Sequence, residues 1–328
     1  MKKFQDIPPY VVSGKAMGLI ADIAAAVERL RIVLEGPDGV RLRRIGHVRT
    51  LRGTTAIEGN TLSEEQITAL LDGKRVVGNR RVIAEIEGAH RAYGRIAEFN
   101  PHAPRDLLKA HALMMGGLVE RPGRFRTGGV GVVDARGRVL HVAPPAHRVP
   151  DLVRDLFAWL AASPDPVLVT SCVFHYEFEF IHPFSDGNGR MGRLWQTALL
   201  GAWRPEMLAV PVENIVWAHQ AGYYAAFRAS GGPAGCGPFI DFMLDKILLA
   251  VRAAGEGAVP KSGEKSREKS REKILRLLKD DPSLTQAGLA AALGLSVKAV
   301  EKNIRQLKDA NRLRRVGPDN GGHWEVVG

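Results

Sequence analysis

The feature that most constrains this 328-residue chain is the stretch 182–193, which reads HPFSDGNGRMGR. Its glycines can adopt positive φ, so that backbone N–H groups converge on an anion. Residues 190–200 continue with a helical pattern, which places the loop before the positive end of a helix. Arg190 and Arg193 are three residues apart and share one helix face, from which both can reach phosphate oxygens. The stretch therefore predicts a phosphate-binding site at a helix N-terminus.

Two further side chains of this stretch carry chemistry. His182 has an unperturbed pKa near neutrality, and Asp186 offers a hard oxygen ligand for a Mg²⁺ ion shared with phosphates. Each part alone is also compatible with a tight connection or a plain helix terminus. The chain has no Gly-x-x-x-x-Gly-Lys-Ser/Thr loop, which disfavours an ordinary P-loop NTPase. His175 and His182 have no third ligand nearby in sequence, so a zinc site is not expected.

The order of His, Asp, Gly-Asn-Gly and two Arg residues resembles the signature of the Fic family. Members of that family mostly transfer AMP from ATP to hydroxyl groups of proteins. The resemblance implies ATP and Mg²⁺ as cofactors, with His182 as the catalytic base and Asp186 as the metal ligand. It also implies nucleotide-binding roles for Gly187, Asn188, Gly189, Arg190 and Arg193, with Arg193 seating the γ-phosphate.

A second segment, 54–60, reads TTAIEGN at the end of a helix predicted over about 40–58. A carboxylate at the C-terminal end of a helix is destabilised by the helix dipole, by roughly 0.3–1 kcal/mol. We therefore expect Glu58 to contact a cation or solvent. The segment resembles the inhibitory helix of many Fic proteins, in which Thr54 would begin the motif and Glu58 would pair with Arg193. Inhibition would then act within one chain or between the subunits of a homodimer.

A β-hairpin is predicted over 130–142, where two β-branched runs flank a turn that contains glycine. An isolated two-stranded hairpin is marginal unless it packs on helices. The region resembles the Fic flap, whose edge pairs with the extended backbone of a target and would here include Val130 and Val132. The alternative is a surface hairpin without a function.

The aromatic pair at 223–224 resembles the family segment that lies against the nucleotide base, and Tyr223 is the candidate for this contact. Paired aromatic residues at helical spacing are also common in cores. Relatives with an adenine-contacting Asn place it about eight residues later, where this chain has Gly231. That departure leaves the details of base recognition open.

Apolar periodicity predicts a mostly α fold: a Fic-type helical core with a β-hairpin flap, plus a small C-terminal winged helix-turn-helix domain. A capping-box pattern at Ser63 opens one of the helices. The other predicted helices cover residues 15–35, 40–58, 81–99, 104–119, 149–162 and 166–180.

We expect an N-terminal helical region over 1–100 with the inhibitory helix at about 40–59, a catalytic core over 101–252, a linker over 253–270 and the winged helix over 271–328. The last 58 residues hold 11 Lys and Arg against 7 Asp and Glu. This positive density suits DNA, while dimerisation or target docking is the alternative role of the module.

Two cysteines do not make a disulfide framework, and the chain has neither a signal-peptide core nor a run of about 18 apolar residues. We therefore expect a cytoplasmic protein without membrane contact. The expected activity is adenylylation of a Ser, Thr or Tyr hydroxyl on a target protein. The alternatives are removal of AMP by the same site, and a nucleotide-sensing transcriptional regulator that binds DNA through 271–328.

Overall fold

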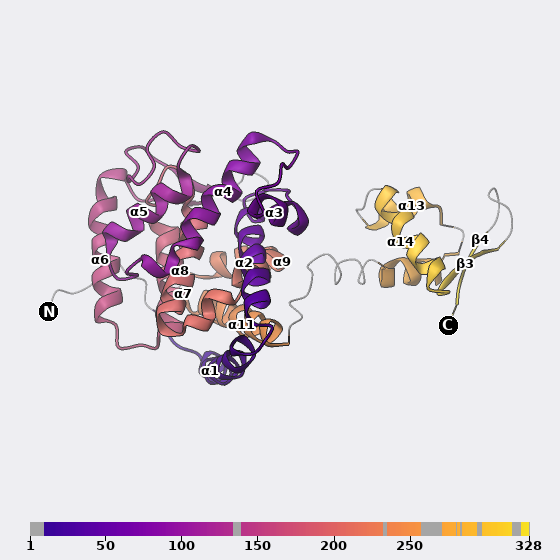
Figure 1. Cartoon of the computed structure of the whole chain (residues 1–328), viewed down its shortest axis with the longest axis horizontal. Coiled ribbons are helices and arrows are strands. Elements are labelled where there is room, and N and C mark those ends of the chain that lie inside the picture. The colour runs from indigo at the N-terminus through magenta and orange to yellow at the C-terminus, as the bar shows by residue number, and fades with distance from the viewer. Residues whose placement is uncertain are drawn as a thin grey trace. The chain divides into compact units, whose positions relative to one another are not determined.

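The computed structural model describes residues 10–133, 139–231, 235–256, 271–279, 281–282, 284–293, 297–316 and 323–327; within these ranges, the side chains of 132–133, 139–141, 287, 291–292 and 297–298 are not described. The chain divides into two compact units, residues 1–259 and 260–328 (Figure 1). The fold is mostly α, as the periodicity predicted.

The larger unit is built from helices joined by short connections (Figure 1). They are α1 (Gly14–Glu35), α2 (Gly39–Ala56), α3 (Glu64–Leu71), α4 (Arg80–Gly94), α5 (Pro104–Met115), α6 (Val149–Ala162), α7 (Val167–Ile181), α8 (Asn188–Trp203), α9 (Val212–Ala218), α10 (Gln220–Ala229) and α11 (Gly237–Gly255), with 3-10 turns at Ile96–Glu98, Ala146–Arg148 and Pro205–Ala209.

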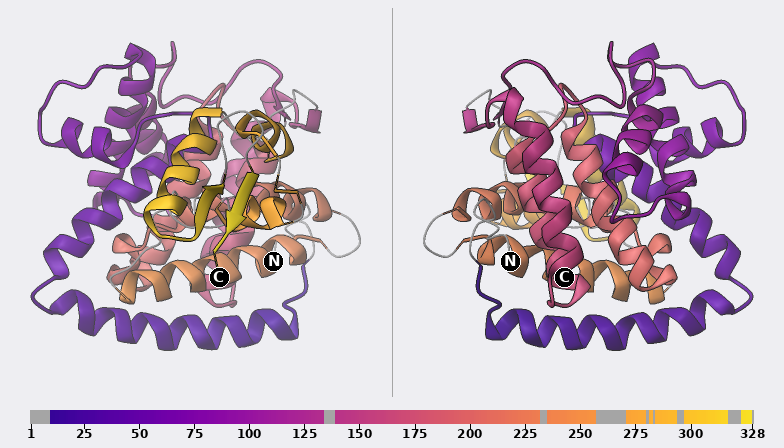
Figure 2. Two further views of the ribbon diagram at one scale, coloured as in Figure 1. Left: turned by 90° about the vertical axis from the view of Figure 1, so that its right-hand side faces the viewer. Right: turned by 90° about the vertical axis from the view of Figure 1, so that its left-hand side faces the viewer.

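Local sequence explains where these helices begin. Ser13 caps α1 by accepting a hydrogen bond from the Ala16 N–H, and the apolar stripe of α1 packs along α11 at one edge of the unit (Figure 2). Ser63 and Gln66 form the predicted capping box of α3, because each side chain accepts from the other's backbone N–H. The predicted capping box at Ser63 is confirmed.

The centre of the unit is the pair α7 and α8, which pack against each other. Nearly every residue of α7 is buried, and so is most of α8. A helix that is apolar on all sides is typical of a buried position. The large side chains of Phe174, Phe178 and Trp195 are fully buried between the surrounding helices. The loop between the two helices, 182–187, therefore lies at one end of this buried helix pair.

Three predicted helix ends differ from the structure. The helix predicted over 81–99 ends at Gly94, and a separate 3-10 turn follows at Ile96–Glu98. The helix predicted over 104–119 ends at Met115, because Gly116 is extended and Gly117 has a φ of +84°. The helix predicted to reach Glu58 ends at Ala56. Gly59, with a φ of +94°, then reverses the chain in the left-handed conformation that glycine tolerates. Glu58 thus lies on a turn that follows the helix.

The predicted hairpin is present as β1 (Gly131–Val133) and β2 (Val139–Val142), which pair antiparallel. Gly131 lies opposite Val142, and the register shifts between Val132 and Val133. The predicted turn, 134–137, lies outside the described residues. Within the described part of the chain, β1 and β2 pair only with each other.

The smaller unit contains a helical segment over 271–279, α13 (Gln286–Leu293), α14 (Val297–Asp309), and the antiparallel pair β3 (Leu313–Val316) and β4 (His323–Val326). Ile274, Leu289, Ile304 and Trp324 belong to its separate core. Residues 294–296 and 317–322, where the winged-helix pattern predicts turns, lie outside the described residues. Across the described parts of both units, no helix combines the length and the apolar character needed to cross a bilayer.

Candidate active site

The loop between α7 and α8 has a constrained backbone. His182 ends α7 with φ 50° and ψ 61°, a left-handed conformation that costs a non-glycine residue about 1–2 kcal/mol. Asn188 holds the loop closed, since its side chain accepts from the Phe184 N–H and donates to the Phe184 carbonyl. Gly187 has a φ of +83°, and a Cβ there would lie 2.6 Å from the Met115 sulfur. The loop is thus built for one conformation.

Asn188 is also one of the residues predicted to bind the nucleotide phosphates. The Asn188 side chain is buried and used within the loop. Asn188 can therefore face an anion only through its backbone N–H, together with those of Gly189 and Arg190 at the start of α8. The first N–H groups of a helix lack intrahelical acceptors, which makes them the natural donors here.

Two buried residues that sequence reasoning missed brace this loop. The Arg126 guanidinium donates to the carbonyl oxygens of His182 (2.8 Å), Ile181 (3.3 Å), Gly128 (2.8 Å) and Pro144 (2.5 Å). Arg126 thus connects the end of α7 with the two segments that flank the hairpin, one before it and one after it. An Arg within a Gly- and Pro-containing segment gave no signal of this role.

The second brace is His111 on α5. Its Nδ1 accepts from the Gly123 N–H at 2.8 Å, so the hydrogen lies on Nε2, which donates to the Asp186 carbonyl at 3.1 Å. The ring stacks on Phe184 with centroids 3.7 Å apart. Burial lowers the pKa of His111 to about 4, which keeps the ring neutral near pH 7. His111 therefore supports the loop without adding charge.

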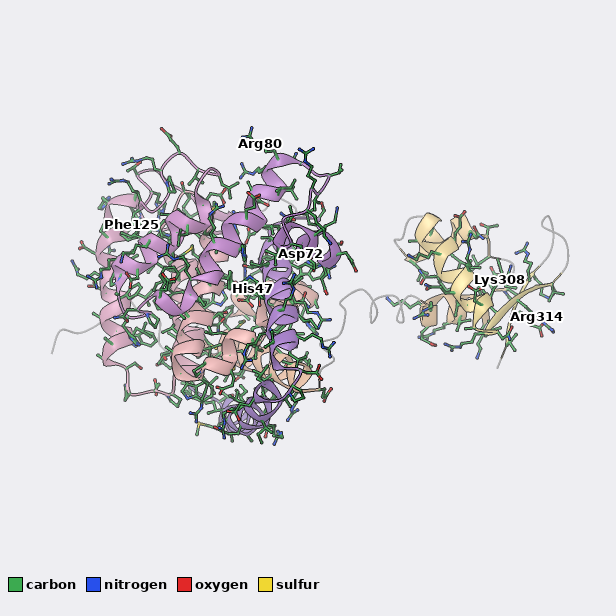
Figure 3. All side chains as sticks on the ribbon, in the orientation of Figure 1. His47, Asp72, Arg80, Phe125, Lys308 and Arg314 are labelled. Atoms are coloured by element: carbon green, nitrogen blue, oxygen red, sulfur yellow. The ribbon has the colours of Figure 1, made fainter. Side chains whose placement is uncertain are left out.

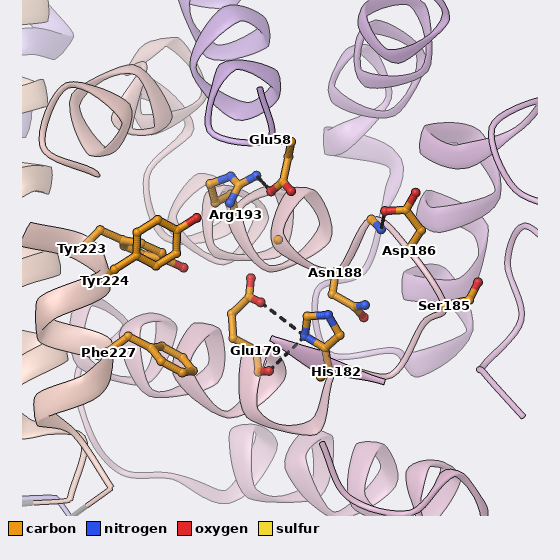
Figure 4. Close-up of a pocket in the computed structure, with 13 residues that line it drawn as sticks. Glu58, Glu179, His182, Ser185, Asp186, Asn188, Arg193, Tyr223, Tyr224 and Phe227 are labelled. Atoms are coloured by element: carbon orange, nitrogen blue, oxygen red, sulfur yellow. Dashed lines mark hydrogen bonds and ion pairs between the residues drawn. The ribbon is translucent and has the colours of Figure 1, made fainter. Parts of the chain in front are cut away.

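The predicted base, His182, has a defined tautomer. Its Nδ1 lies 3.2 Å from the Glu179 carbonyl oxygen. A carbonyl can only accept, so Nδ1 carries the hydrogen and Nε2 is the nitrogen that can take a proton. The Glu179 carboxylate lies 3.7 Å from the same Nδ1, where it would stabilise the imidazolium (Figure 4).

Glu179 is a functional candidate that the sequence did not indicate. Its side chain is 8% exposed, and its Oε1 has no hydrogen-bond partner among the described residues. Burial raises the pKa of Glu179 to about 7, although Arg193 acts in the opposite direction. This carboxylate lines the same cavity as His182.

The raised pKa of Glu179 predicts a pH-dependent stability. Between the ordinary value of 4.5 and about 7 the folded state holds more protons than the unfolded state, so stability falls as pH rises through this window. The side chain of Glu179→Gln cannot ionise, so the variant does not show this fall in stability. At pH 8 the unfolding free energy of the variant should exceed that of wild type by up to roughly 3 kcal/mol, and its melting temperature should be higher. At pH 4.5 the two proteins should melt at nearly the same temperature. A difference of equal size at both pH values, measured by thermal denaturation, would contradict this account.

The predicted pairing of Glu58 with Arg193 is present. Arg193 NH2 lies 2.7 Å from Glu58 Oε1, and the guanidinium also donates to the hydroxyl and the carbonyl of Thr54 (Figure 4). Arg193 is buried, whereas 36% of the Glu58 side chain is exposed. Burial opposes the charge of both groups, but their mutual attraction wins: the pKa of Glu58 is lowered and that of Arg193 is raised. Both partners are therefore ionised.

These groups surround one cavity of about 210 Å³, below the roughly 300 Å³ at which small-molecule pockets usually begin. Glu58 fills part of this space. The signature loop and His182 form one side of the cavity, and the aromatic side chains of α10 face them across it (Figure 4). The lining residues are Glu58, Gly131, Glu179, His182, Ser185, Asp186, Gly187, Asn188, Gly189, Arg193, Tyr223, Tyr224 and Phe227.

The aromatic wall differs in accessibility. Tyr223 is buried, and its hydroxyl donates to His175 Nε2 at 3.2 Å. Tyr224 is only partly buried, and Phe227 lies one turn further along α10. Gly231, the position that the resemblance assigns to an adenine-contacting Asn, has a φ of +87°, and a Cβ there would lie 3.0 Å from the Tyr176 hydroxyl. A side chain at that position is disfavoured by strain and by space.

Asp186 alone offers too few ligand atoms for a divalent cation, so the ion would also need oxygen atoms from a bound nucleotide. Its side chain is 42% exposed and lines the cavity. Oδ1 accepts from the Gly187 N–H (2.6 Å) and from Arg190 (3.3 Å), and Oδ2 accepts from Arg81 (3.2 Å). The described residues contain no cluster of three or more metal-ligating side chains. One hard carboxylate fits Mg²⁺ that arrives with phosphate oxygens, as this ion prefers.

The hairpin contributes to the rim of the cavity. Gly131 of β1 is one of the lining residues, and the Val130 carbonyl accepts from the Ala143 N–H at the base of the hairpin. Val130 is partly buried, while the side chain of Val132 is not described. The hairpin therefore lies where an extended segment on it would be close to His182.

Comparison with known families gives two matches. The Fic/DOC family model matches residues 101–200. A model described as winged helix-turn-helix DNA-binding matches residues 267–314. Both predicted resemblances are thereby confirmed.

Curated relatives include the protein adenylyltransferase fic-1 of Caenorhabditis elegans, 30% identical over 191 residues, which are 54% of this chain and 35% of the relative. The protein adenylyltransferase Fic of Nematostella vectensis is 29% identical over 159 residues, 45% of this chain and 36% of the relative. The matched part is thus only about a third of the length of these relatives.

Among solved structures, a Fic family protein from Desulfovibrio desulfuricans G20 aligns with a TM-score of 0.73 and 38% sequence identity, over 98% of both chains. Residues 134–508 of Fic-1 from Caenorhabditis elegans align with a TM-score of 0.57 and 23% identity, over 74% of this chain and 72% of that one. At that identity the second likeness concerns the fold alone.

Proposed function

The chain belongs to the Fic family, and from that membership we propose that it transfers AMP from ATP to a hydroxyl side chain of a target protein. The observation that carries the proposal is that His182, Asp186 and Arg193 line one cavity at the start of α8. We assign them the roles of base, metal ligand and anion ligand. The names of the curated relatives, protein adenylyltransferases, support the same reaction.

The chain's own residues suit each requirement of this reaction. His182 Nε2 would take the proton of a Ser, Thr or Tyr hydroxyl, whose oxygen attacks the α-phosphorus. The bond between that phosphorus and the oxygen bridging to the β-phosphate then breaks, and pyrophosphate leaves. Backbone N–H groups of Asn188 and Gly189, with Arg190, would hold the negative charge of the phosphates, whereas the Gly187 N–H, also predicted for this role, donates to Asp186 Oδ1. Arg193 would seat the γ-phosphate.

Asp186 would hold Mg²⁺ jointly with the phosphates, and the ion, when bound, would supply positive charge that offsets theirs. Asp186 is held in place by the Gly187 N–H and, through its carbonyl, by His111. For the adenine base, Tyr224 is a better candidate than the predicted Tyr223, because both line the cavity but Tyr223 is buried whereas Tyr224 is only partly buried. Tyr223 and Phe227 would complete the wall beneath it.

The inhibitory role of Glu58 follows from what it occupies. Its carboxylate holds the guanidinium that the γ-phosphate needs, and Thr54 holds the same guanidinium from the helix side. ATP could bind productively only after Glu58 leaves. We propose that the contact between Glu58 and Arg193 inhibits the reaction, within one chain or between the subunits of a homodimer.

We propose that the target is oriented by the hairpin. A strand that pairs along β1 or β2 would present its side chains near His182, since Gly131 lines the cavity. Backbone pairing of this kind reads little sequence, so target choice would depend on other contacts. We further propose that the protein acts in the cytoplasm.

The reaction is tested with ATP labelled in two positions. Incubation of the protein with cell lysate and Mg²⁺ should transfer label from the α-phosphate of ATP to protein, and none from the γ-phosphate. Transfer of γ-label would indicate phosphorylation instead and would overturn the proposal.

Removal of AMP is a second candidate activity, because the Glu58 carboxylate lines the same cavity as His182 and could direct a water molecule. It is tested with a target that already carries labelled AMP. Release of AMP by wild type, lost in Glu58→Gly, would favour removal over addition.

The match of 267–314 to a winged helix-turn-helix DNA-binding model supports DNA as a partner and, with it, a regulatory function that senses nucleotide. Lys302, Arg305 and Lys308 are exposed on α14, and Arg314 is exposed on β3 (Figure 3). Asn303, in contrast, is buried and bonds to the Ala299 carbonyl. The basic side chains would contact phosphates.

We expect the full-length protein to retard duplex DNA at low salt, with an affinity that falls as salt rises. Arg305→Gln should reduce the slope of log affinity against log salt by about 1, as expected for one lost phosphate contact. Arg91→Gln, on α4 of the larger unit, is the control. No retardation even at low salt would favour a docking role for the module.

A further inference from the structure

Four charged side chains beside the cavity form a closed ring of alternating sign. Asp186 Oδ2 lies 3.2 Å from Arg81 NH2, and Arg81 Nε lies 3.7 Å from Glu85 Oε1. Glu85 Oε1 lies 3.8 Å from Arg190 NH1, and Arg190 NH2 lies 3.3 Å from Asp186 Oδ1. Each carboxylate therefore sits between two guanidinium groups. Neither Arg81 nor Glu85 belongs to the signature loop; both are on α4.

The ring has a fixed side and an open side. The side chains of Arg190 and Glu85 are 3% and 13% exposed, whereas those of Asp186 and Arg81 are 42% and 61% exposed. Glu85 is further held by Asn60, whose Nδ2 donates to Oε2 at 2.9 Å. Asn60 itself donates to the Val82 carbonyl. Of the two guanidinium groups on Asp186, that of Arg81 can move away without exposing a buried charge, whereas that of Arg190 cannot.

This arrangement bears on cation binding. A divalent cation that approaches Asp186 meets a guanidinium already on Oδ2, and one of the two positive charges has to move away. An exposed ion pair of this kind is weak, so it changes an equilibrium by at most about fivefold. Glu85 Oε1, already close to Arg81 Nε, offers the departing guanidinium a second carboxylate.

We propose that Arg81 is a built-in counter-ion of Asp186 that the divalent cation displaces, and that Glu85 is the positioning residue that receives it. The inference rests on the proposed function, because it takes Asp186 as the metal ligand. Arg81 then raises the cation concentration needed to half-saturate the site. Glu85 reduces this increase, because it gives the displaced guanidinium a second carboxylate. Through Asn60, the same carboxylate is tied to the turn that carries Glu58.

The test measures Mn²⁺ binding, by the electron paramagnetic resonance signal of the free ion, to the full-length protein with α,β-methylene ATP. All variants carry Glu58→Gly, so that the γ-phosphate seat is open. Arg81→Gln should lower the half-saturating Mn²⁺ concentration by about two- to fivefold. Glu85→Gln, which keeps the shape and the acceptor for Asn60, should raise it, because Arg81 loses its second carboxylate.

Neighbouring residues on α4 supply matched controls for the general effect of charge. Arg80 is exposed at the start of the helix (Figure 3) and Glu87 is exposed further along it. Arg80→Gln and Glu87→Gln should leave half-saturation unchanged. In the double variant Arg81→Gln/Glu85→Gln, the effect of Glu85→Gln should disappear, since it acts through Arg81.

Three outcomes overturn the proposal. Arg81→Gln could bind Mn²⁺ equally or more weakly, which would mean that the guanidinium does not compete. Arg80→Gln could shift half-saturation as much as Arg81→Gln, which would leave only a general charge effect. Finally, Asp186→Asn could leave Mn²⁺ binding intact; in that case Asp186 is not the metal ligand, and the metal assignment of the proposed function fails with it.

Discussion

Glu58→Gly should raise labelling from α-labelled ATP, on the protein itself or on targets in lysate, by roughly 10- to 100-fold over wild type. The carboxylate makes a charge-assisted hydrogen bond of 2.7 Å to Arg193. Such bonds contribute about 1.5–3 kcal/mol, and each 1.4 kcal/mol is about tenfold in an equilibrium. ATP has to replace this bond in wild type and meets an open guanidinium in the variant. The measurement is the initial rate of label incorporation at saturating Mg²⁺.

The contact with Arg193 can be separated from other effects of the substitution. Glu58→Gln keeps the size of the side chain but removes its charge, and it should give most of the increase. Glu87→Gln removes an exposed carboxylate from α4 and should label like wild type. Equal labelling of Glu58→Gly and wild type would show that the Glu58–Arg193 pair does not limit the reaction.

His182→Ala, introduced into Glu58→Gly, should reduce the rate of transfer by at least about 100-fold, the usual contribution of a general base. Nucleotide affinity should change little, because the phosphates are held by the start of α8 and by Arg190 and Arg193. Label incorporation gives the rate, and equilibrium binding of a fluorescent ATP analogue gives the affinity. Persistent transfer would remove His182 as the base.

The backbone at His182 allows loss of the base to be distinguished from loss of structure. A glycine tolerates φ 50° where alanine does not. His182→Gly should therefore melt about 2–4 °C above His182→Ala, the shift expected for about 1 kcal/mol in a protein of this size. Both variants should be equally inactive. His147→Ala, at an exposed histidine, should keep full activity.

Much of the site was predictable from residues close together in sequence. The stretch 182–193 indicated a phosphate-binding loop before a helix, and α8 begins within it at Asn188. The capping box at Ser63 and the span of α6 are also as predicted. These features depend on backbone preferences and hydrogen bonds over a few residues, which the local sequence carries.

Other assignments needed the packed structure. The contact by which the Asn188 side chain closes the loop onto Phe184 had no signal in the sequence. Tyr223, the expected base contact, uses its hydroxyl on His175. Sequence did not indicate Glu179, because a carboxylate in a helical pattern has no mark that it faces an apolar surrounding. Its raised pKa follows from burial, which only tertiary packing produces.

The chemistry of the signature loop, the mostly helical fold and, through family resemblance, the pairing expected for Glu58 could all be predicted from the sequence. The distant groups around that loop could not: Arg193 contacts Thr54, 139 residues away in the chain, and Asp186 contacts Arg81, 105 residues away. Such contacts arise from the packing of whole helices. α2 and α4 bring their side chains to the start of α8 only when their apolar faces are buried together.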